Sequence, residues 1–180
     1  MCPEADVLAV GIGELKISNL PGQELAAYGL GSCIGLVLWG PAGGRRVLAM
    51  AHVVMPDSHG RRDGGPAKYA DLVVPDVVQR LLAAGCRRDH LQAVMAGGAC
   101  MFPGLAALGD IGAANGARVR RGLQEAGIPL RSAEIGGNRG RTLLADVATG
   151  RISSTTAGGA PVILWPAERL PEPIERGPSR

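Results

Sequence analysis

Residues 34–55 read IGLVLWGPAGGRRVLAMAHVVM, and this stretch decides the fold class. Its first part, Ile34–Trp39, is a near-continuous apolar run closed by Gly40-Pro41, which is typical of a buried strand. A second apolar run covers Val47–Met55 and is ended by Pro56-Asp57. Only the short Gly40–Arg46 connection separates the two runs, so we predict that they are neighbouring strands of a hairpin.

The elements around this stretch predict a mixed fold. Residues 67–84 are expected to be helical, because apolar residues recur on one face and Gly85 follows the last of them. Pro75 falls inside that pattern and should kink the helix or mark its true start. Asp110 is expected to cap a second helix that runs to Ala126. Short strands are predicted at 6–10, 91–95, 131–135, 141–147, 151–154 and 161–165. The predicted class is α/β, a layered sandwich of mixed β-sheet with helices on one face.

Composition limits what the chain can be. Its 180 residues suit a single domain, which we place at residues 1–165, with a proline-rich and flexible tail at 166–180. The net charge is +3, with scattered arginine pairs and few aromatic residues, which argues against nucleic-acid binding. The N-terminus resembles no secretory signal, and no stretch has the apolar length of a membrane span. The four cysteines show no zinc-motif spacing, so we expect a cytoplasmic protein with reduced thiols and no metal.

Cys33 is the candidate nucleophile. It stands in Gly29-Leu30-Gly31-Ser32-Cys33-Ile34-Gly35, directly before the first buried strand. Glycines leave backbone N–H groups unobstructed, so the backbone of Gly31, Ser32 and Cys33 is suited to hold an oxyanion. The alternative for this segment alone is a small buried cysteine in a tight turn. Cys100, which follows Gly97-Gly98, is the rival nucleophile, but no histidine lies near it in the sequence.

His52 is the candidate general base, because an imidazole on an otherwise apolar strand needs a partner. It could be a core histidine bonded to a backbone carbonyl. If instead it adjoins Cys33 across the hairpin, a thiolate and an imidazolium would stabilise each other and lower the pKa of the cysteine. His59 and His90 are expected on the surface.

These residues resemble the signature of the chemoreceptor glutamine deamidase family, CheD. The resemblance runs in order through Gly29–Cys33, Ala51-His52 and Met55-Pro56, and continues nearly to the end of the body. Further matches are Lys68-Tyr69, Gly97-Gly98-Ala99 with Met101-Phe102, Ile111-Gly112 with Asn115, Gly136-Gly137, and Gly140-Arg141. It implies a sandwich similar to the catalytic domain of the cytotoxic necrotizing factor toxins.

The resemblance also implies an activity and partners. It implies a protein-glutamine glutaminase that converts receptor glutamines to glutamate without a cofactor, with Cys33 as nucleophile and His52 as base. Where the family commonly has a threonine that orients the histidine, this chain has Ala27, whose backbone carbonyl could do the same. It implies a CheC-type phosphatase as a second partner, and we expect Met101 and Phe102 to belong to a partner-binding surface. Two alternatives remain: a catalytically weakened or inactive binding protein, and a different Cys-His hydrolase such as a peptidase or free-glutamine amidase.

Overall fold

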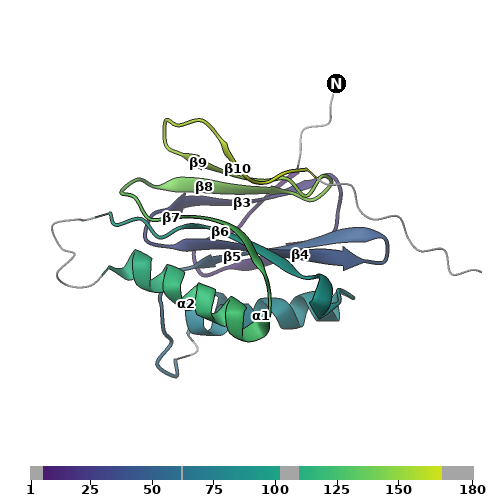
Figure 1. Cartoon of the computed structure of the whole chain (residues 1–180), viewed down its shortest axis with the longest axis horizontal. Coiled ribbons are helices and arrows are strands. Elements are labelled where there is room, and N and C mark those ends of the chain that lie inside the picture. The colour runs from purple at the N-terminus through teal and green to yellow at the C-terminus, as the bar shows by residue number, and fades with distance from the viewer. Residues whose placement is uncertain (1–5, 62, 102–109, 168–180) are drawn as a thin grey trace, which may run out of the picture.

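The computed structural model describes residues 6–61, 63–101 and 110–167, which form three layers: two five-stranded sheets and a layer of helices (Figure 1). The central sheet has the order β2 (Leu15–Ser18), β5 (Arg45–Val53), β4 (Ile34–Ala42), β6 (Gln92–Gly97) and β7 (Leu130–Ile135). The outer sheet has the order β1 (Asp6–Ala9), β3 (Gln23–Leu30), β8 (Arg141–Asp146), β9 (Ile152–Thr156) and β10 (Val162–Trp165). Helices α1 (Ala70–Ala83) and α2 (Ile111–Ala126) cover the free face of the central sheet, and 3-10 turns occur at Pro66–Lys68 and Arg88–His90. The predicted fold class is confirmed.

The predicted hairpin is confirmed as β4 and β5. Their antiparallel register runs from Ile34 opposite Val53 to Ala42 opposite Arg45. The turn is Gly43-Gly44, and both glycines have positive φ angles, as tight hairpin turns require. β4 is longer than predicted, because its pairing with β5 continues to Ala42 and so includes Pro41. On its other side, β6 pairs with β4 only as far as Trp39. Pro41 therefore lies where β4 has become an edge strand on that side, and its missing N–H breaks no pairing there.

The alternation along β4 and β5 supplies two apolar cores. Leu36 and Ala51 face the helices, where they join a cluster that includes Val77 of α1 and Val119 of α2. The intervening residues face the outer sheet and pack between the two sheets. This inter-sheet core is made by Leu25, Ala27, Leu30, Val37, Trp39, Leu48, Met50, Val94, Leu143, Ala145 and Ile152, among others. Since both faces of the hairpin are buried, both had to be apolar.

Both predicted helices are present. Asp110 caps α2 as expected: its Oδ1 accepts a hydrogen bond from Ala113 N (3.0 Å), and Gly127 ends the helix in the left-handed conformation. Pro75 does not mark the start of α1, because the helix begins at Ala70 and continues past Pro75 to Ala83. Burial of one face of α1 against the central sheet outweighs the single backbone hydrogen bond that a proline removes.

Two strands, β2 and β3, were not predicted. β3 reads QELAAYGL, and its glutamine, glutamate and alanines have low strand propensity. Its place between β1 and β8 comes from pairing on both sides, parallel to β1 and antiparallel to β8. The other predicted strands are present with ends shifted by one or two residues. Most of the predicted tail lies outside the described residues, and no helix within them has the length and apolarity to cross a membrane.

Candidate active site

Cys33 and His52 face the same layer of the molecule. Cys33 directly precedes β4, is partly exposed, and packs against the inter-sheet core. His52 lies on β5 and is 2% exposed; by strand alternation it shares the inter-sheet face with Leu48 and Met50. In the hairpin register His52 is opposite Gly35, so Cys33 is its diagonal neighbour on that face. Such neighbours have Cα atoms about 7–8 Å apart, a distance that long side chains can bridge.

Gly35 leaves room for this arrangement. A Cβ atom at Gly35 would lie 2.7 Å from Leu30 Cδ1 and 2.8 Å from Leu143 Cδ2. Both leucines belong to the inter-sheet core, and they already fill the space beside the histidine. A larger residue at position 35 would therefore push against the same layer that holds His52.

His52 is held by the N-terminal segment that leads into β2. Its backbone N–H donates to Glu14 O (3.0 Å), and its carbonyl accepts from Gly13 N (2.9 Å). Its ring Nδ1 lies 3.4 Å from Val10 O. The acceptor beside this ring nitrogen is thus the carbonyl of Val10, whereas the sequence suggests that of Ala27 or another nearby acceptor. Ala27 is fully buried on β3 and faces the inter-sheet core with its methyl group.

The remaining nitrogen of the histidine is available. His52 Nε2 is buried and has no hydrogen-bond partner among the described residues, so the thiol of Cys33 is not hydrogen-bonded to it in this structure. A buried nitrogen without a partner is costly, which makes it a candidate for a group that takes up a proton. Catalytic hydrogen bonds are often long in an enzyme without substrate and tighten when substrate binds.

Burial sets the ionisation of both groups. It raises the pKa of the Cys33 thiol and lowers the pKa of the His52 imidazole, while the hydrogen bond to Val10 opposes the shift at His52. The ion pair suggested by the sequence would shift both pKa values in the opposite directions, and it stays a prediction. Desolvation disfavours the charged form of each group, the thiolate and the imidazolium.

In the turn before β4, the carbonyls accept hydrogen bonds, whereas the N–H groups have no partner among the described residues. The carbonyl of Gly31 accepts from Ala99 N (2.8 Å), that of Ser32 from Asn115 Nδ2 (3.0 Å), and that of Cys33 from Gly98 N (2.8 Å). The N–H groups of the same three residues make no hydrogen bond within the described parts of the chain. Unpaired backbone donors next to a thiol are what an oxyanion site would use, and this is the role that the sequence predicts for Gly31, Ser32 and Cys33.

The segment after β6 closes this turn tightly. Gly97 has φ 119°, and a Cβ atom there would overlap the carbonyl oxygen of Cys33. Met101 lies over Gly31: a Cβ atom on Gly31 would be 3.1 Å from Met101 Cγ. Met101 is 43% exposed, and Phe102, the other residue predicted for a partner surface, lies outside the described residues.

The other candidate groups lie elsewhere or lack partners for chemistry. Cys86 is buried, its thiol lies 3.7 Å from Gly40 O, and burial raises its pKa to about 11. Cys100 is partly exposed, and its backbone N–H donates to Gly137 O. His59 and His90 are exposed, as predicted. The described residues hold no group of three or more His, Cys, Asp or Glu side chains that could bind a metal ion.

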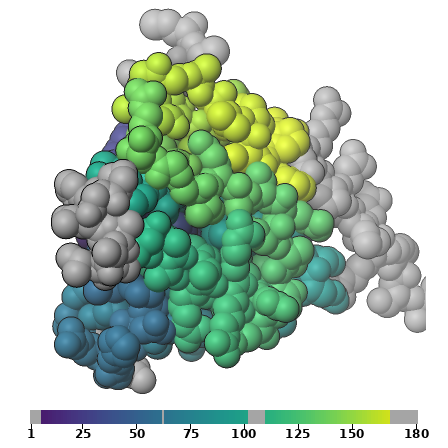
Figure 2. All heavy atoms as spheres, turned by 60° about the vertical axis from the view of Figure 1, so that its left-hand side comes forward, coloured from purple at the N-terminus to yellow at the C-terminus, as the bar shows by residue number. Residues whose placement is uncertain are grey.

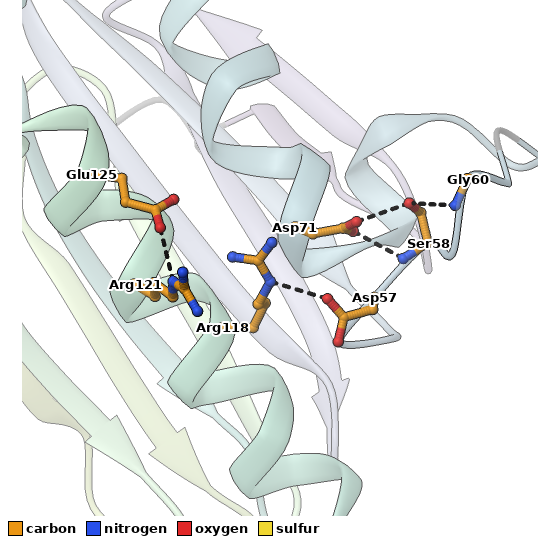
Figure 3. Close-up of polar contacts among 7 residues, drawn as sticks. All are labelled: Asp57, Ser58, Gly60, Asp71, Arg118, Arg121 and Glu125. Atoms are coloured by element: carbon orange, nitrogen blue, oxygen red, sulfur yellow. Dashed lines mark hydrogen bonds and ion pairs between the residues drawn. The ribbon is translucent and has the colours of Figure 1, made fainter.

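Helix α2 ties down the segment that leaves β5. Its residue Arg118 donates to Asp57 Oδ1 (3.0 Å), while Asp71 of α1 accepts from the backbone N–H and the hydroxyl of Ser58 (Figure 3). The segment after β5, drawn in blue, accordingly lies against α2 in the space-filling view (Figure 2). Two residues that contact the site carry no role in the sequence prediction: Val10 and Asn115. In the sequence, Asn115 stands out only as part of a motif.

Comparison with known proteins shows the family of this chain. The family model described as CheD chemotactic sensory transduction matches residues 54–156, a range that begins just after His52. A protein of Symbiobacterium thermophilum named "Probable chemoreceptor glutamine deamidase CheD" is 47% identical over 154 residues, covering 83% of this chain and 92% of that protein. A protein of Clostridium botulinum with the same name is 37% identical over 154 residues, covering 84% and 93%. The chain belongs to the CheD family.

Proposed function

We propose that this protein is a hydrolase that deamidates glutamine side chains of chemoreceptors, with Cys33 as nucleophile and His52 as general base. The observation that carries the proposal is the turn at residues 31–33, where three backbone N–H groups without partners in the described structure include that of Cys33, the diagonal neighbour of the buried His52. The names of the relatives supply the substrate, because they describe chemoreceptor glutamine deamidases. The proposed place of action is the cytoplasm, where reducing conditions keep thiols free.

The reaction is an acyl transfer in two halves. His52 takes the proton of the Cys33 thiol as the sulfur attacks the carbon of the glutamine amide. The backbone N–H groups of the turn stabilise the negative oxygen that forms. The protonated His52 then gives its proton to the leaving ammonia, and a thioester remains. Water activated by His52 hydrolyses the thioester, releases the thiol and leaves a glutamate.

The decisive experiment is mass spectrometry of a chemoreceptor cytoplasmic domain after incubation with the protein. We expect the mass increase of glutamine-to-glutamate conversion at specific sites, with an equal amount of ammonia released and no cleavage of the chain. Cleavage would indicate a peptidase instead. Ammonia from free glutamine, with an unchanged receptor, would indicate a small-molecule amidase.

A binding protein without activity is the second candidate, and the alanine at position 27 favours it. Against it stands the contact of His52 Nδ1 with Val10 O, because a carbonyl can fix the ring and its tautomer as a threonine hydroxyl would. We therefore expect Ala27→Thr to leave kcat within about threefold of the wild type. A large gain in kcat would show that the ring is poorly oriented in the natural protein.

The ionisation of the site predicts an unusual pH profile. Because the pKa of His52 is lowered by burial, its neutral form persists to lower pH, and the acid limb of kcat/KM should fall below pH 6.5, the ordinary value for histidine. Because the pKa of Cys33 is raised, alkylation by iodoacetamide should keep rising above pH 9.0, the ordinary value for the thiol. Alkylation of a Cys33→Ala variant gives the background from the other thiols. A plateau of alkylation at neutral pH would instead reveal a thiolate–imidazolium pair.

A partner-binding surface at Met101 and Phe102 belongs to the same proposal. The exposed Met101 covers Gly31, so a protein that docks on this residue would also cover the turn that holds Cys33. A receptor must reach this place to be modified, and a CheC-type phosphatase bound there would compete with it. Competition between the two partners in a pull-down assay would test this shared use of the surface.

A further inference from the structure

Asn115 links the two strands of the candidate site. It lies on α2, is fully buried, and its side-chain amide nitrogen donates to Ser32 O (3.0 Å) and Val54 O (2.9 Å). Ser32 directly precedes Cys33, and Val54 is two residues beyond His52. A single side chain from the helix layer thus fastens the start of β4 to the end of β5.

The cost of this amide argues for a role beyond packing. Asn115 Oδ1 is buried without a hydrogen-bond partner in the described structure, and a buried unpaired carbonyl oxygen is unfavourable. An apolar residue would fill the site without that cost, but it would leave the carbonyls of Ser32 and Val54 without this donor. We infer that the asparagine is present for its two N–H groups, which hold the carbonyls of Ser32 and Val54.

We propose that Asn115 is a positioning residue that fixes the Ser32–Cys33 peptide so that the Cys33 N–H can stabilise the oxyanion; this rests on the proposed function. In a planar trans peptide the C=O and the following N–H point in opposite directions. The bond from Asn115 to Ser32 O therefore turns the Cys33 N–H away from α2. Among the three engaged carbonyls of the turn, only that of Ser32 is held by a side chain; the other two bind backbone N–H groups.

Loss of Asn115 should affect the transition state of the reaction more than the bound substrate. Without Asn115, the Ser32–Cys33 peptide can rotate, and its N–H no longer meets the oxygen where charge develops. The ground-state glutamine carries little charge on that oxygen, so its binding should change little. The thiol itself stays on the same strand end, where Gly98 N still binds the carbonyl of Cys33.

The test compares Asn115→Ala with Arg118→Ala in the full-length protein. Arg118 also tethers α2 to the segment after β5, through Asp57, but it does not contact the turn at residues 31–33. We expect Asn115→Ala to lower kcat for receptor deamidation about 10- to 100-fold, with KM within about twofold of the wild type. Its rate of Cys33 alkylation by iodoacetamide should stay within about twofold, because alkylation creates no oxyanion. Arg118→Ala should keep kcat within about twofold.

Two results would overturn the inference. One is an unchanged kcat in Asn115→Ala; the other is a loss of kcat matched by an equal loss of alkylation, which would mean a general displacement of the thiol. If Asn115→Ala does not fold, Asn115→Ser, which leaves a smaller void and adds no charge, is judged by the same criteria. Absence of deamidation by the wild-type protein would instead refute the proposed function, so the two failures are distinguishable.

Discussion

Replacement of Cys33 by alanine is expected to abolish deamidation, lowering kcat at least about 10⁴-fold. The proposed reaction proceeds through a thioester on this sulfur, and an alanine at this position has no group that can form one. Stability should change little, because Cys33 is only partly buried. The measurement is ammonia release from a purified receptor domain, with the melting temperature of each variant recorded alongside.

Cys100→Ala is the matched control. Cys100 is also a partly exposed free thiol, and it follows the glycine pair whose first member contacts Cys33. We expect this variant to retain kcat within about threefold of the wild type. Normal activity in Cys33→Ala together with loss of activity in Cys100→Ala would assign the chemistry to the rival thiol.

Replacement of Gly97 by alanine should have the largest effect on stability. Its φ of 119° is disfavoured for any residue with a side chain, and the added methyl group would overlap the carbonyl oxygen of Cys33 and lie 3.3 Å from Ile34 Cα. Strained backbone and overpacking each cost about 1–3 kcal/mol, so we expect about 2–6 kcal/mol of lost stability. Urea unfolding followed by circular dichroism measures this loss.

Gly22→Ala provides the comparison for that loss. Gly22 is exposed in the turn before β3, its φ is outside the left-handed region, and a Cβ atom there would meet nothing within 4 Å. Its free energy of unfolding should therefore stay within about 0.5 kcal/mol of the wild type. Equal effects in the two variants would show that β6 can move away from β4 without cost. The Gly97 variant should also lose activity in its folded fraction, because its methyl group displaces the carbonyl of the nucleophile.

The sequence predicts the central hairpin well because β4 and β5 are apolar on both faces and close through a glycine turn. It does not predict β3, whose residues favour helix and whose strand geometry comes from neighbours on either side. The ends of α2 are predicted because Asp110 and Gly127 act locally. Local chemistry is visible in a sequence, whereas pairing between distant segments is not.

The same division holds for the candidate site. Cys33 and His52 can be proposed from sequence, because a thiol in a glycine turn and a histidine on an apolar strand are unusual in themselves. Val10 and Asn115 cannot, because Val10 acts 42 positions from its partner, and Asn115 acts 83 and 61 positions from its partners. The pKa shifts at the two groups are hard to predict from the sequence for a related reason. Charge pairing is suggested by residue type, but desolvation depends on how deeply the whole fold buries both groups.

The separation between the reactive hairpin and the residues that hold it has a consequence for synthesis of the chain. Thiol and imidazole both lie in the first third of the sequence, so they leave the ribosome early, and a two-residue turn joins their strands. The amide of Asn115, which holds the peptide before the thiol, arrives much later, with the second helix. A nascent chain therefore carries the reactive pair before it carries the means to hold a substrate oxygen. On the proposed role of Asn115, catalytic competence would be gained only when α2 docks, which would link activity to completion of the fold.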